Sequence, residues 1–540
     1  MDEEAYDYVI VGGGSAGCVL AARLSERPDV TVCLIEAGPR DRSPLIHIPL
    51  GIVALGNHRT LNWRHRTTAQ ATAGGRAIGV PRGRTLGGSS AINGMVYTRG
   101  HPADYDEWAA AANPGWAWRQ VLPYFRRSEN NETWRSSRFH GTGGPLNVAD
   151  PGSLNGMVEV LFAATDSLQI RRCADFNGAD QEGFGLRQVT QRNGRRESAA
   201  TAFLAPALGR PNLRVLTGRL AQRVALHGRR AHAVELVAGA RVHRIAARRE
   251  IVLAAGAIAS PLLLQRSGIG AGAELAAHGI AVALDAPEVG RNLQDHAAAA
   301  VRVASRTRVP YGLSLGALPG IAAAAIDYLI HRRGLFASNV MQAGGFVRTD
   351  PALARPDIQY SFMPALRSPT GGIVPGAYGY ALSAFLLRPR SRGTVRLGGA
   401  DARAEPLIDP RFLSAPEDLE TLLRGVALAR RILAAPAFDR HRGRELAPGA
   451  EVQDEDSLRD FIRRTSATAY HPAGTCRMGS DERAVVDPQL RVRGIDGLRV
   501  VDASIMPTII GGNTNAPVIM IAEKAADMIL GRAPPPADPA

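Results

Sequence analysis

The first 36 residues constrain the fold more than any other part of the chain. A short apolar run, Tyr8–Val11, leads into Gly12-Gly-Gly-Ser-Ala-Gly17, and residues 18–24 then have helical spacing. A second apolar run, Val30–Ile35, ends at Glu36. Strand, glycine turn, helix, strand and acid in this order are typical of the βαβ unit that binds a dinucleotide. We therefore predict an α/β fold with a Rossmann-like unit at the N-terminus.

The glycines of this turn have distinct physical roles. Gly12 makes the tight turn, Gly14 lets a pyrophosphate approach the backbone, and Gly17 lets the helix pack on the strand. The helix N-terminus then faces the phosphates, and Glu36 can bind ribose hydroxyls. An acid at this position disfavours a 2′-phosphate and hence NADP, but it leaves both NAD and FAD open.

A second glycine-rich stretch favours FAD over NAD. Residues 83–100 are dense in Gly and Ser, contain Asn93, and also carry apolar residues such as Leu86 and Met95. That apolar content argues against a flexible linker. Glycines let a backbone approach a ligand closely, and hydroxyl and amide groups can bond to a polar ring edge. We interpret the stretch as a packed loop against a flat cofactor, for which a nicotinamide enzyme has no obvious need.

Charge and cysteine content limit the partners. The formal net charge is +14, and the basic charge is nearly all scattered Arg, with Lys524 as the one lysine. We favour composition bias over a nucleic-acid or anionic-membrane surface, because no basic run or nucleic-acid-binding motif is present. The four cysteines lie far apart with no CxxC, which excludes a disulfide scaffold and a zinc cluster, so no metal site is expected.

No targeting or spanning segment is expected. The N-terminus lacks the pattern of a signal peptide, and the apolar stretch Leu315–Ile330 is interrupted by Pro319 and Asp327. We expect a cytoplasmic protein without a transmembrane segment.

The order of strand and helix patterns predicts two domains built from alternating segments. Residues 1–155, with a lid at about 39–82, 213–300 and 461–530 are assigned to an FAD-binding domain. Residues 156–212 and 301–460 are assigned to an inserted α+β substrate domain that contains an antiparallel sheet. The tail, residues 531–540, has four prolines and is predicted to be disordered.

Taken together, these stretches resemble the glucose–methanol–choline (GMC) oxidoreductases. The loop Gly83–Asp106 fits the first family signature, and residues 256–270 fit the second. Val289–His296, Tyr470–Gly479 and Asp502–Pro517 match further family markers in order along the chain. The resemblance covers the whole chain apart from the tail and points to the choline dehydrogenase-like and hydroxymethylfurfural oxidase-like branch. It implies FAD and the oxidation of alcohols.

The resemblance also implies which residues hold FAD. Members with covalent FAD attach it to a His two residues before the loop's Asn; that position is Ala91 here, so non-covalent FAD is expected. Ser15, Ala16, Glu36 and Ala37 are expected at the ADP half, and the backbone of Val224 at the adenine. The other expected cofactor contacts are Trp63, Leu86, Ser90, Asn93, Gly94, Met95, Val96, Tyr470, Asp502, Ala503 and Thr514, together with the glycines of the first turn.

The catalytic expectation rests on His471 and Asn515. Alcohol oxidation needs a base that takes the hydroxyl proton while a hydride leaves for the flavin, and histidine titrates in the right range. His471 resembles the catalytic His of the family, and Asn515 is matched to its partner position. An amide there can bond the substrate oxygen without competing for the proton; Asn515 could instead cap a helix.

The substrate is expected to be a neutral primary alcohol, aromatic or aliphatic. Choline-oxidising relatives carry a Glu in the segment that matches residues 337–346, where this chain has Gln342, a poor partner for a cation. Tyr470 could add an aromatic wall. The electron acceptor is oxygen or a quinone. The alternatives are a lyase or a light-driven fatty-acid decarboxylase of the same fold, and a basic nucleic-acid-binding module is remote.

Overall fold

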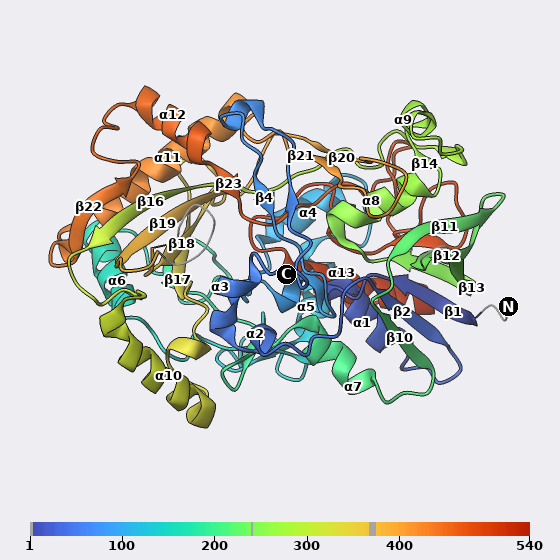
Figure 1. Cartoon of the computed structure of the whole chain (residues 1–540), viewed down its shortest axis with the longest axis horizontal. Helices are drawn as coiled ribbons and strands as arrows, with labels where there is room; N and C mark the ends of the chain where they lie inside the picture. Colours follow the sequence, from blue (N-terminus) through green and yellow to red (C-terminus); the bar gives the residue numbers. More distant parts are fainter. Residues whose placement is uncertain (1–3, 239–240, 367–373, 540) are drawn as a thin grey trace.

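The computed structural model describes residues 4–238, 241–366 and 374–539. Two seven-stranded sheets lie at opposite ends of the molecule, with helices and loops packed around and between them (Figure 1). One sheet is mostly parallel and the other is antiparallel. The predicted α/β fold, with a Rossmann-like domain and a second domain that contains an antiparallel sheet, is confirmed.

The first sheet has the strand order β10-β2-β1-β13-β12-β11, with β24 beside β13. Its parallel part pairs β1 with β2 and β13, β2 with β10, and β13 with β24. Every residue of β2 is buried, as expected for a parallel strand covered on both faces. The strands are β1 (Glu4–Val11), β2 (Val32–Glu36), β10 (Leu213–Thr217), β11 (Ala221–His227), β12 (Arg230–Ala238), β13 (Arg241–Leu253) and β24 (Leu498–Val500).

Helices from both ends of the chain meet on this sheet. α1 (Ser15–Leu24) packs against α13 (Asn515–Leu530), and α13 packs in turn against α5 (Trp118–Ser128). All but three residues of α1 and α13 up to Asp527 are buried, which explains their apolar, Ala-rich sequences. α8 (Gly256–Arg266) follows β13 and packs against β11. The N-terminal and C-terminal segments thus build one core.

The second sheet has the strand order β22-β16-β19-β18-β17-β7, with β23 beside β16. The long amphipathic helix α11 (Pro416–Leu433) packs against β16 and β19, and α12 (Glu455–Thr465) packs on α11. The strands are β7 (Gly183–Leu186), β16 (Ala297–Ser305), β17 (Ala343–Val347), β18 (Ile358–Met363), β19 (Gly379–Leu386), β22 (Arg442–Ala447) and β23 (Ala467–Thr468). Its apolar core is separate from that of the first sheet.

The remaining helices and strands lie outside the two large sheets and their main helices. They include α2 (Pro44–His47), α3 (Ile52–Leu55), β3 (His65–Arg66), β4 (Gly79–Val80), α4 (Pro102–Ala110), β5 (Glu129–Asn131), β6 (Leu146–Val148), α6 (Met157–Ser167), β8 (Gln191–Arg192), β9 (Arg195–Arg196), α7 (Ala205–Ala207), β14 (Ile269–Gly270), α9 (Gly272–Ala277), β15 (Leu284–Asp285), α10 (Leu318–His331), β20 (Thr394–Arg396) and β21 (Leu407–Asp409).

Three details differ from the expected boundaries. β23 belongs to the second sheet, although it lies in the segment assigned to the FAD domain. Residues 199–207, assigned to the substrate domain, pack on α1 in the first core. The tail, expected to be disordered, contacts α5, because Asp538 N donates to Arg119 O at 2.8 Å and Asp538 pairs with Arg126 at 3.1 Å. Sequence periodicity could not assign such short pieces to one sheet or the other.

Within the described ranges, no helix has the length and apolar character that would be needed to cross a membrane.

Candidate active site

The N-termini of α1 and α13 meet at one point. Ser15 Oγ donates to Asn515 Oδ1 at 2.7 Å, and Thr514 is the N-cap residue of α13. Neither helix has an acidic residue in its first turn, and neither N-cap side chain bonds its helix. The first N–H groups of both helices, and the positive ends of both dipoles, are therefore available to an anion. This arrangement suits a pyrophosphate.

The glycines around these helix starts fill two different roles. A Cβ at Gly12 would lie 2.5 Å from Ala254 O, and one at Gly17 would lie 1.8 Å from Gly12 O, so both positions need glycine for packing. At Gly14 the nearest atom to a Cβ is 3.9 Å away. The open side of Gly14 is where a ligand can approach the backbone. With Ala16 buried behind it, the turn fits a dinucleotide as predicted from sequence.

Glu36 closes the far end of this turn. Its two carboxylate oxygens accept from Gly13 N at 2.9 Å and Gly38 N at 2.7 Å, and burial raises its pKa to about 7. A carboxylate keeps further acceptor capacity for a ribose hydroxyl, and Ala37 follows directly in the chain. The backbone of Val224 is expected at the adenine, and its N–H donates to Ser267 Oγ at 2.8 Å; its contact with the adenine stays a prediction.

The loop 83–100 packs directly on the glycine turn. Gly87 N donates to Gly13 O at 2.7 Å, and a Cβ at Gly88 would lie 2.7 Å from Gly14 Cα. Leu86 is buried against Gly13. Ala91 is buried in a small apolar cluster. The predicted packed loop is therefore present, although its contact with a cofactor stays a prediction.

Asn93 to Val96 form the tightest part of the loop. Met95 has a φ of +60°, and Asn93 Oδ1 accepts from Met95 N at 3.0 Å to hold that turn. A Cβ at Gly94 would lie 2.4 Å from Met341 Cε, so the end of the Met341 side chain packs directly on this glycine. Val96 forms a β-bridge with Val189.

The buried side chain of Arg196 holds the loop 83–100 in place by hydrogen bonds, a role that was not predicted from the sequence. It is buried and donates to Ser90 O, Asn93 O and Asn93 Oδ1 at 2.7–3.3 Å. Burial lowers its pKa to about 9, and among the described residues it has no carboxylate partner. Ser90 Oγ, expected at the cofactor, bonds Gly87 O at 2.6 Å and Ala199 N at 3.0 Å. The Ser90 hydroxyl thus holds the loop rather than facing a ligand.

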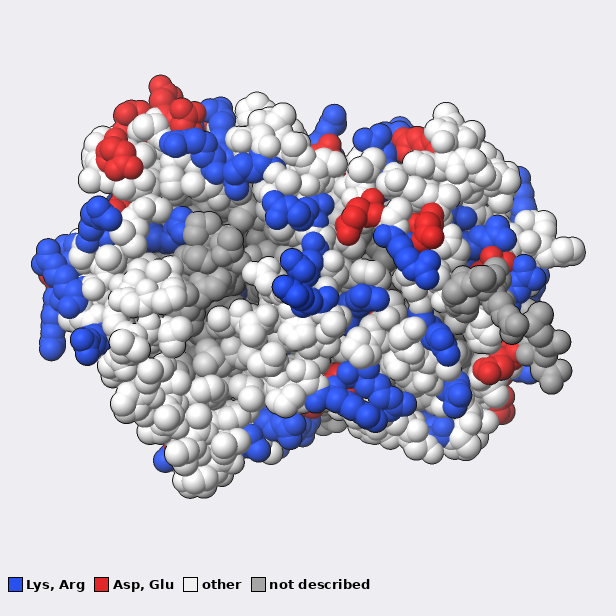
Figure 2. Space-filling model, viewed as in Figure 1, with Lys and Arg blue, Asp and Glu red and all other residues white. Residues whose placement is uncertain are grey.

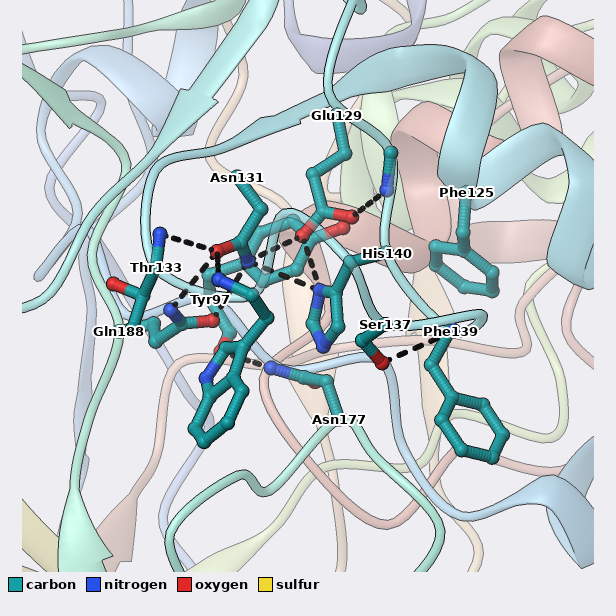
Figure 3. A network of polar contacts seen from close by, with 12 residues as sticks. Tyr97, Phe125, Glu129, Asn131, Thr133, Ser137, Phe139, His140, Asn177 and Gln188 are labelled. Carbon is teal, nitrogen blue, oxygen red and sulfur yellow. Dashed lines mark hydrogen bonds and ion pairs between the residues drawn. The ribbon is translucent and has the colours of Figure 1, made fainter.

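A buried polar network continues from the loop (Figure 3). His140 lies between Glu129, 3.0 Å from its Nδ1, and Asp175, 2.9 Å from its Nε2. Arg99 forms an ion pair with Glu129 at 2.5 Å, and Arg99 N donates to Asn177 Oδ1 at 2.9 Å. The burial of His140 lowers its pKa, but the bonds to Asp175 and Glu129 outweigh that effect and leave the pKa raised. These charge-assisted bonds fix the backbone that follows Val96.

Asp502 joins the first sheet to this region. Its carboxylate accepts from Gly256 N at 2.8 Å, Ser260 Oγ at 2.6 Å and Ser504 N at 2.8 Å. Ala503 O accepts from Gly474 N at 3.1 Å, which ties the loop after His471 to the same place. Asp502 and Ala503 therefore lie where the loop after His471 meets the first core, and their contact with FAD stays a prediction.

Asn513, and not Asn515, is the amide that faces His471. Asn513 Nδ2 lies 3.1 Å from His471 Nε2, whereas Asn515 bonds Ser15 at the start of α1. The sequence assignment of Asn515 is therefore corrected to Asn513, two residues earlier. His471 follows β23 and Asn513 precedes α13, so the pair forms where the second sheet meets the first core.

His296 completes the cluster and was also missed. Its Nδ1 lies 3.0 Å from His471 Nδ1. It ends the motif Val289–His296 and stands directly before β16, next to β23 in the second sheet. Because His296 ends a motif that had been recognised in the sequence, it could have been named as a candidate site residue from the sequence.

Arg187 fixes the orientation of the Asn513 amide. Arg187 Nη2 and Gln359 Nε2 both donate to Asn513 Oδ1, at 3.3 and 3.1 Å. Because both groups are donors, the amide oxygen faces them and the NH₂ group faces His471. His471 Nε2 is then an acceptor, and its proton is on Nδ1 toward His296. The lone pair of Nε2 therefore faces the Asn513 amide.

The electrostatics keep His471 neutral. Burial lowers its pKa well below the usual range, and His296, Arg82 and Arg187 lower it further. Burial also lowers the pKa of His296 to about 4 and that of Arg187 to about 10. Arg187 has no carboxylate partner among the described residues; Ser361 Oγ accepts from it at 2.6 Å.

The backbone before His471 is held in an unusual conformation. Tyr470 has a φ of +70°, and Arg82 Nη2 donates to Tyr470 O at 2.6 Å. Asp295 Oδ1 accepts from His471 N at 2.9 Å, and burial raises the pKa of Asp295 to about 6. The Tyr470 side chain is 43% exposed. Its expected roles at the cofactor and the substrate stay predictions.

Two expected residues lie outside this cluster. Gln342 is buried, and its amide bonds Asn155 N at 2.9 Å and Ser153 O, so it is turned into the protein rather than toward a substrate. That expectation is wrong because the segment's backbone direction could not be read from sequence. Trp63 stacks with His65 at 5.7 Å and lies under Arg84 at 4.9 Å.

Comparisons with known proteins agree with this arrangement. The chain is 45% identical over 527 residues to "Alcohol dehydrogenase [acceptor]" of Pseudomonas putida, covering 97% of this chain and 96% of the relative. It is 42% identical over 530 residues to "Oxygen-dependent choline dehydrogenase" of Brucella suis, covering 98% and 96%. The crystal structure of pyridoxine 4-oxidase from Mesorbium loti matches with a TM-score of 0.89 at 36% identity, covering 98% of this chain and 100% of the other.

More distant structures include a fungal aryl-alcohol oxidase, with a TM-score of 0.84 at 26% identity over 98% and 99% of the two chains. Models of the N-terminal and C-terminal parts of the GMC oxidoreductases match residues 6–298 and 389–522. The resemblance seen in the sequence is thereby confirmed, and with it FAD as cofactor and CH–OH groups as the site of oxidation. The chain belongs to the GMC oxidoreductase family.

Proposed function

We propose that this enzyme oxidises an uncharged primary alcohol to the aldehyde, with His471 as the base. The observation that carries the proposal is the pairing of His471 Nε2 with Asn513 Nδ2 at 3.1 Å. A substrate hydroxyl group that takes the place of this direct contact can donate to the imidazole and accept from the amide at the same time. Those are the two interactions that removal of the hydroxyl proton requires.

Each side chain of the cluster then has a defined task. His471 Nε2 takes the hydroxyl proton, and its low pKa keeps it unprotonated and ready at neutral pH. An N–H of Asn513 bonds the oxygen and stabilises the negative charge that develops there. His296 orients the ring through Nδ1. Bound FAD, expected to be non-covalent, supplies the acceptor for the hydride that leaves the carbon atom bearing the hydroxyl group.

Arg187 acts on the oxygen through Asn513. Its positive charge at the amide oxygen polarises the amide and makes the N–H a stronger donor. The same charge supports the proposal of an uncharged substrate. Two like unit charges about 6 Å apart repel by roughly 3 kcal/mol at an effective dielectric constant of 20, so a quaternary ammonium would bind poorly beside Arg187.

The names of the relatives support an alcohol but differ on its charge. Alcohol, pyridoxine and aryl-alcohol enzymes are among them, and so are choline dehydrogenases. The electrons that reach the flavin leave to oxygen or to a quinone.

An anaerobic panel of alcohols tests the proposal. We expect the yellow protein to bleach with neutral aliphatic or aromatic primary alcohols and to stay oxidised with choline. Air then restores the colour within seconds for an oxidase, and only an added quinone restores it for a dehydrogenase. A cyanohydrin and a fatty acid under blue light complete the panel; turnover of either without bleaching would replace alcohol oxidation by the lyase or decarboxylase alternative.

The charge of Arg187 should be visible in the pH profile. Activity requires neutral His471 and falls as the pH drops through its pKa. Removing a neighbouring cation favours the protonated imidazole and raises that pKa, so Arg187→Met should move the acid limb of kcat/KM upward by roughly one pH unit. Arg187→Lys keeps a cation, so its acid limb of kcat/KM should stay near that of the wild type, and the same is expected for Ser361→Ala. An acid limb that does not shift in Arg187→Met would show that the charge of Arg187 does not lower the pKa of His471.

A further inference from the structure

Large apolar side chains are exposed along one helix of the second domain. Of the 14 residues of α10, only Tyr328 is buried. Leu318, Ile326, Leu329 and Ile330 are 49–66% exposed, and Leu315, just before the helix, is 87% exposed. In Figure 1 α10 projects from the body of the molecule, and Figure 2 shows an uncharged ridge in the same place. Exposed apolar groups gathered on one element mark an interaction surface.

The exposed residues form a stripe on the helix. Leu318, Ala322, Ile326 and Leu329 follow each other at intervals of four, four and three residues, so they share one face. The opposite face is anchored through Tyr328, whose hydroxyl donates to Gly194 O at 3.2 Å. The helix is therefore fixed to the protein with its apolar side outward.

The charges around the stripe are almost all positive. Residues 306–341 contain one acid, Asp327, and its charge is balanced by Arg333 at 3.1 Å. Arg306, Arg308 and Arg332 remain in that segment. Arg308 lies next to Gly316 before the helix, and Arg332 lies over the Tyr328 ring at 5.1 Å at its end. Basic residues thus stand at both ends of the apolar stripe.

We propose that α10 docks this enzyme on the surface of an anionic lipid bilayer. An apolar face rimmed by arginines is the pattern of a helix that lies in the membrane interface. The exposed residues are aliphatic, whereas the cores of protein interfaces are enriched in Tyr, Trp, Phe and Met. The face is also convex and projecting, which suits immersion in lipid better than a flat contact with a second copy.

Docking would bring the active-site loop near the membrane. The chain that leaves α10 returns directly to the loop 83–100, where Asn339 Nδ2 donates to Gly94 O at 2.8 Å and Met341 covers Gly94. A lipophilic alcohol or acceptor dissolved in the bilayer would then lie close to this loop. The docking itself does not depend on the proposed reaction.

Vesicle flotation with the FAD-loaded protein tests the proposal. We expect it to float with vesicles of phosphatidylcholine and phosphatidylglycerol at 3:1 and to remain mostly unbound with phosphatidylcholine alone. The variant L315S/I326S/L329S/I330S should bind the anionic vesicles at least about tenfold more weakly. Arg308→Gln should weaken binding roughly fivefold, as expected for the loss of one basic residue near an anionic surface.

The control variant V282S/L407S removes two apolar side chains that are 47% and 42% exposed elsewhere on the protein, and it should bind like the wild type. All variants should keep their flavin content, melting temperature and activity with a soluble dye acceptor, which separates lost docking from lost folding or lost chemistry. Unbound wild type, equal binding to neutral vesicles, or equal binding by the α10 variant would overturn the proposal. So would a wild-type dimer in solution that the α10 variant dissociates, because α10 would then join two copies.

Discussion

His471→Ala should abolish reduction of the bound flavin by the alcohol while the protein stays yellow. A positioned general base contributes roughly 10²- to 10⁴-fold to proton transfer, so the anaerobic reduction rate should fall by at least about 100-fold. The side chain contacts His296 and Asn513 and none of the glycines of the turn. The FAD content and the flavin spectrum should therefore remain those of the wild type. Stopped-flow absorbance during mixing with substrate measures the rate.

His441→Ala is the matched control for this variant. His441 is also buried and bonded, through Nδ1 to Thr307 Oγ1 at 2.7 Å, but it directly precedes β22, which is an edge strand of the second sheet. Its loss should leave the reduction rate within a few-fold of the wild type. The pH dependence adds a second readout, because the residual rate of His471→Ala should rise with hydroxide as the alkoxide fraction grows. A reduction rate near that of the wild type in His471→Ala would remove it as the base.

The sequence was sufficient for the βαβ unit and for the packed loop 83–100. The turn of Gly12 to Gly17 depends on local backbone geometry, and local geometry is what a short sequence specifies best. The loop was recognisable because glycines and buried apolar residues occur together in it. Both were placed correctly without knowledge of any contact between distant segments.

The partners of His471 could not be found in this way. Asn513 and Asn515 differ by two residues, and which of them faces the imidazole depends on how the chain turns from an irregular loop into α13. Arg187 directly follows β7 and Gln359 lies in β18, and only the assembled second sheet brings them to Asn513. No periodic pattern or spacing encodes such contacts.

Two buried arginines give the site a common electrostatic character. Arg187 contacts the Asn513 amide, and Arg196 contacts the loop at Asn93, each held by neutral oxygens. Among the described residues neither has a carboxylate partner, although a buried charge is costly unless it is compensated. In the proposed reaction, the charge of Arg187 acts through Asn513 on the negative charge that develops on the substrate oxygen. Burial lowers the pKa of each, to about 10 and about 9, yet both stay protonated at neutral pH.

Asn513→Leu and Asn515→Leu should have opposite effects on catalysis and cofactor binding. Asn513 donates toward the site of the hydroxyl oxygen, and the loss of one such donor costs roughly 10²- to 10³-fold in rate. We therefore expect Asn513→Leu to reduce its flavin about 100-fold more slowly or worse, with FAD still bound. Asn515 bonds Ser15 Oγ between the two helix N-termini. We expect Asn515→Leu to lose FAD more readily, measured by fluorescence of the released flavin during dialysis.

With saturating FAD, the reduction rate of Asn515→Leu should stay within a few-fold of the wild type. Ser15→Ala removes the other partner of the same hydrogen bond and should lose FAD as readily as Asn515→Leu does. The FAD loss would then come from the broken bond between α1 and α13 and not from the leucine side chain. The two leucine variants differ by two positions in one segment, so a general disturbance of the α13 start would affect both measurements in both proteins. If the flavin is reduced slowly in FAD-saturated Asn515→Leu and at a normal rate in Asn513→Leu, then Asn515 is the catalytic partner of His471, as the sequence predicted. The opposite result would establish that the amide beside His471 is the one that holds the substrate oxygen.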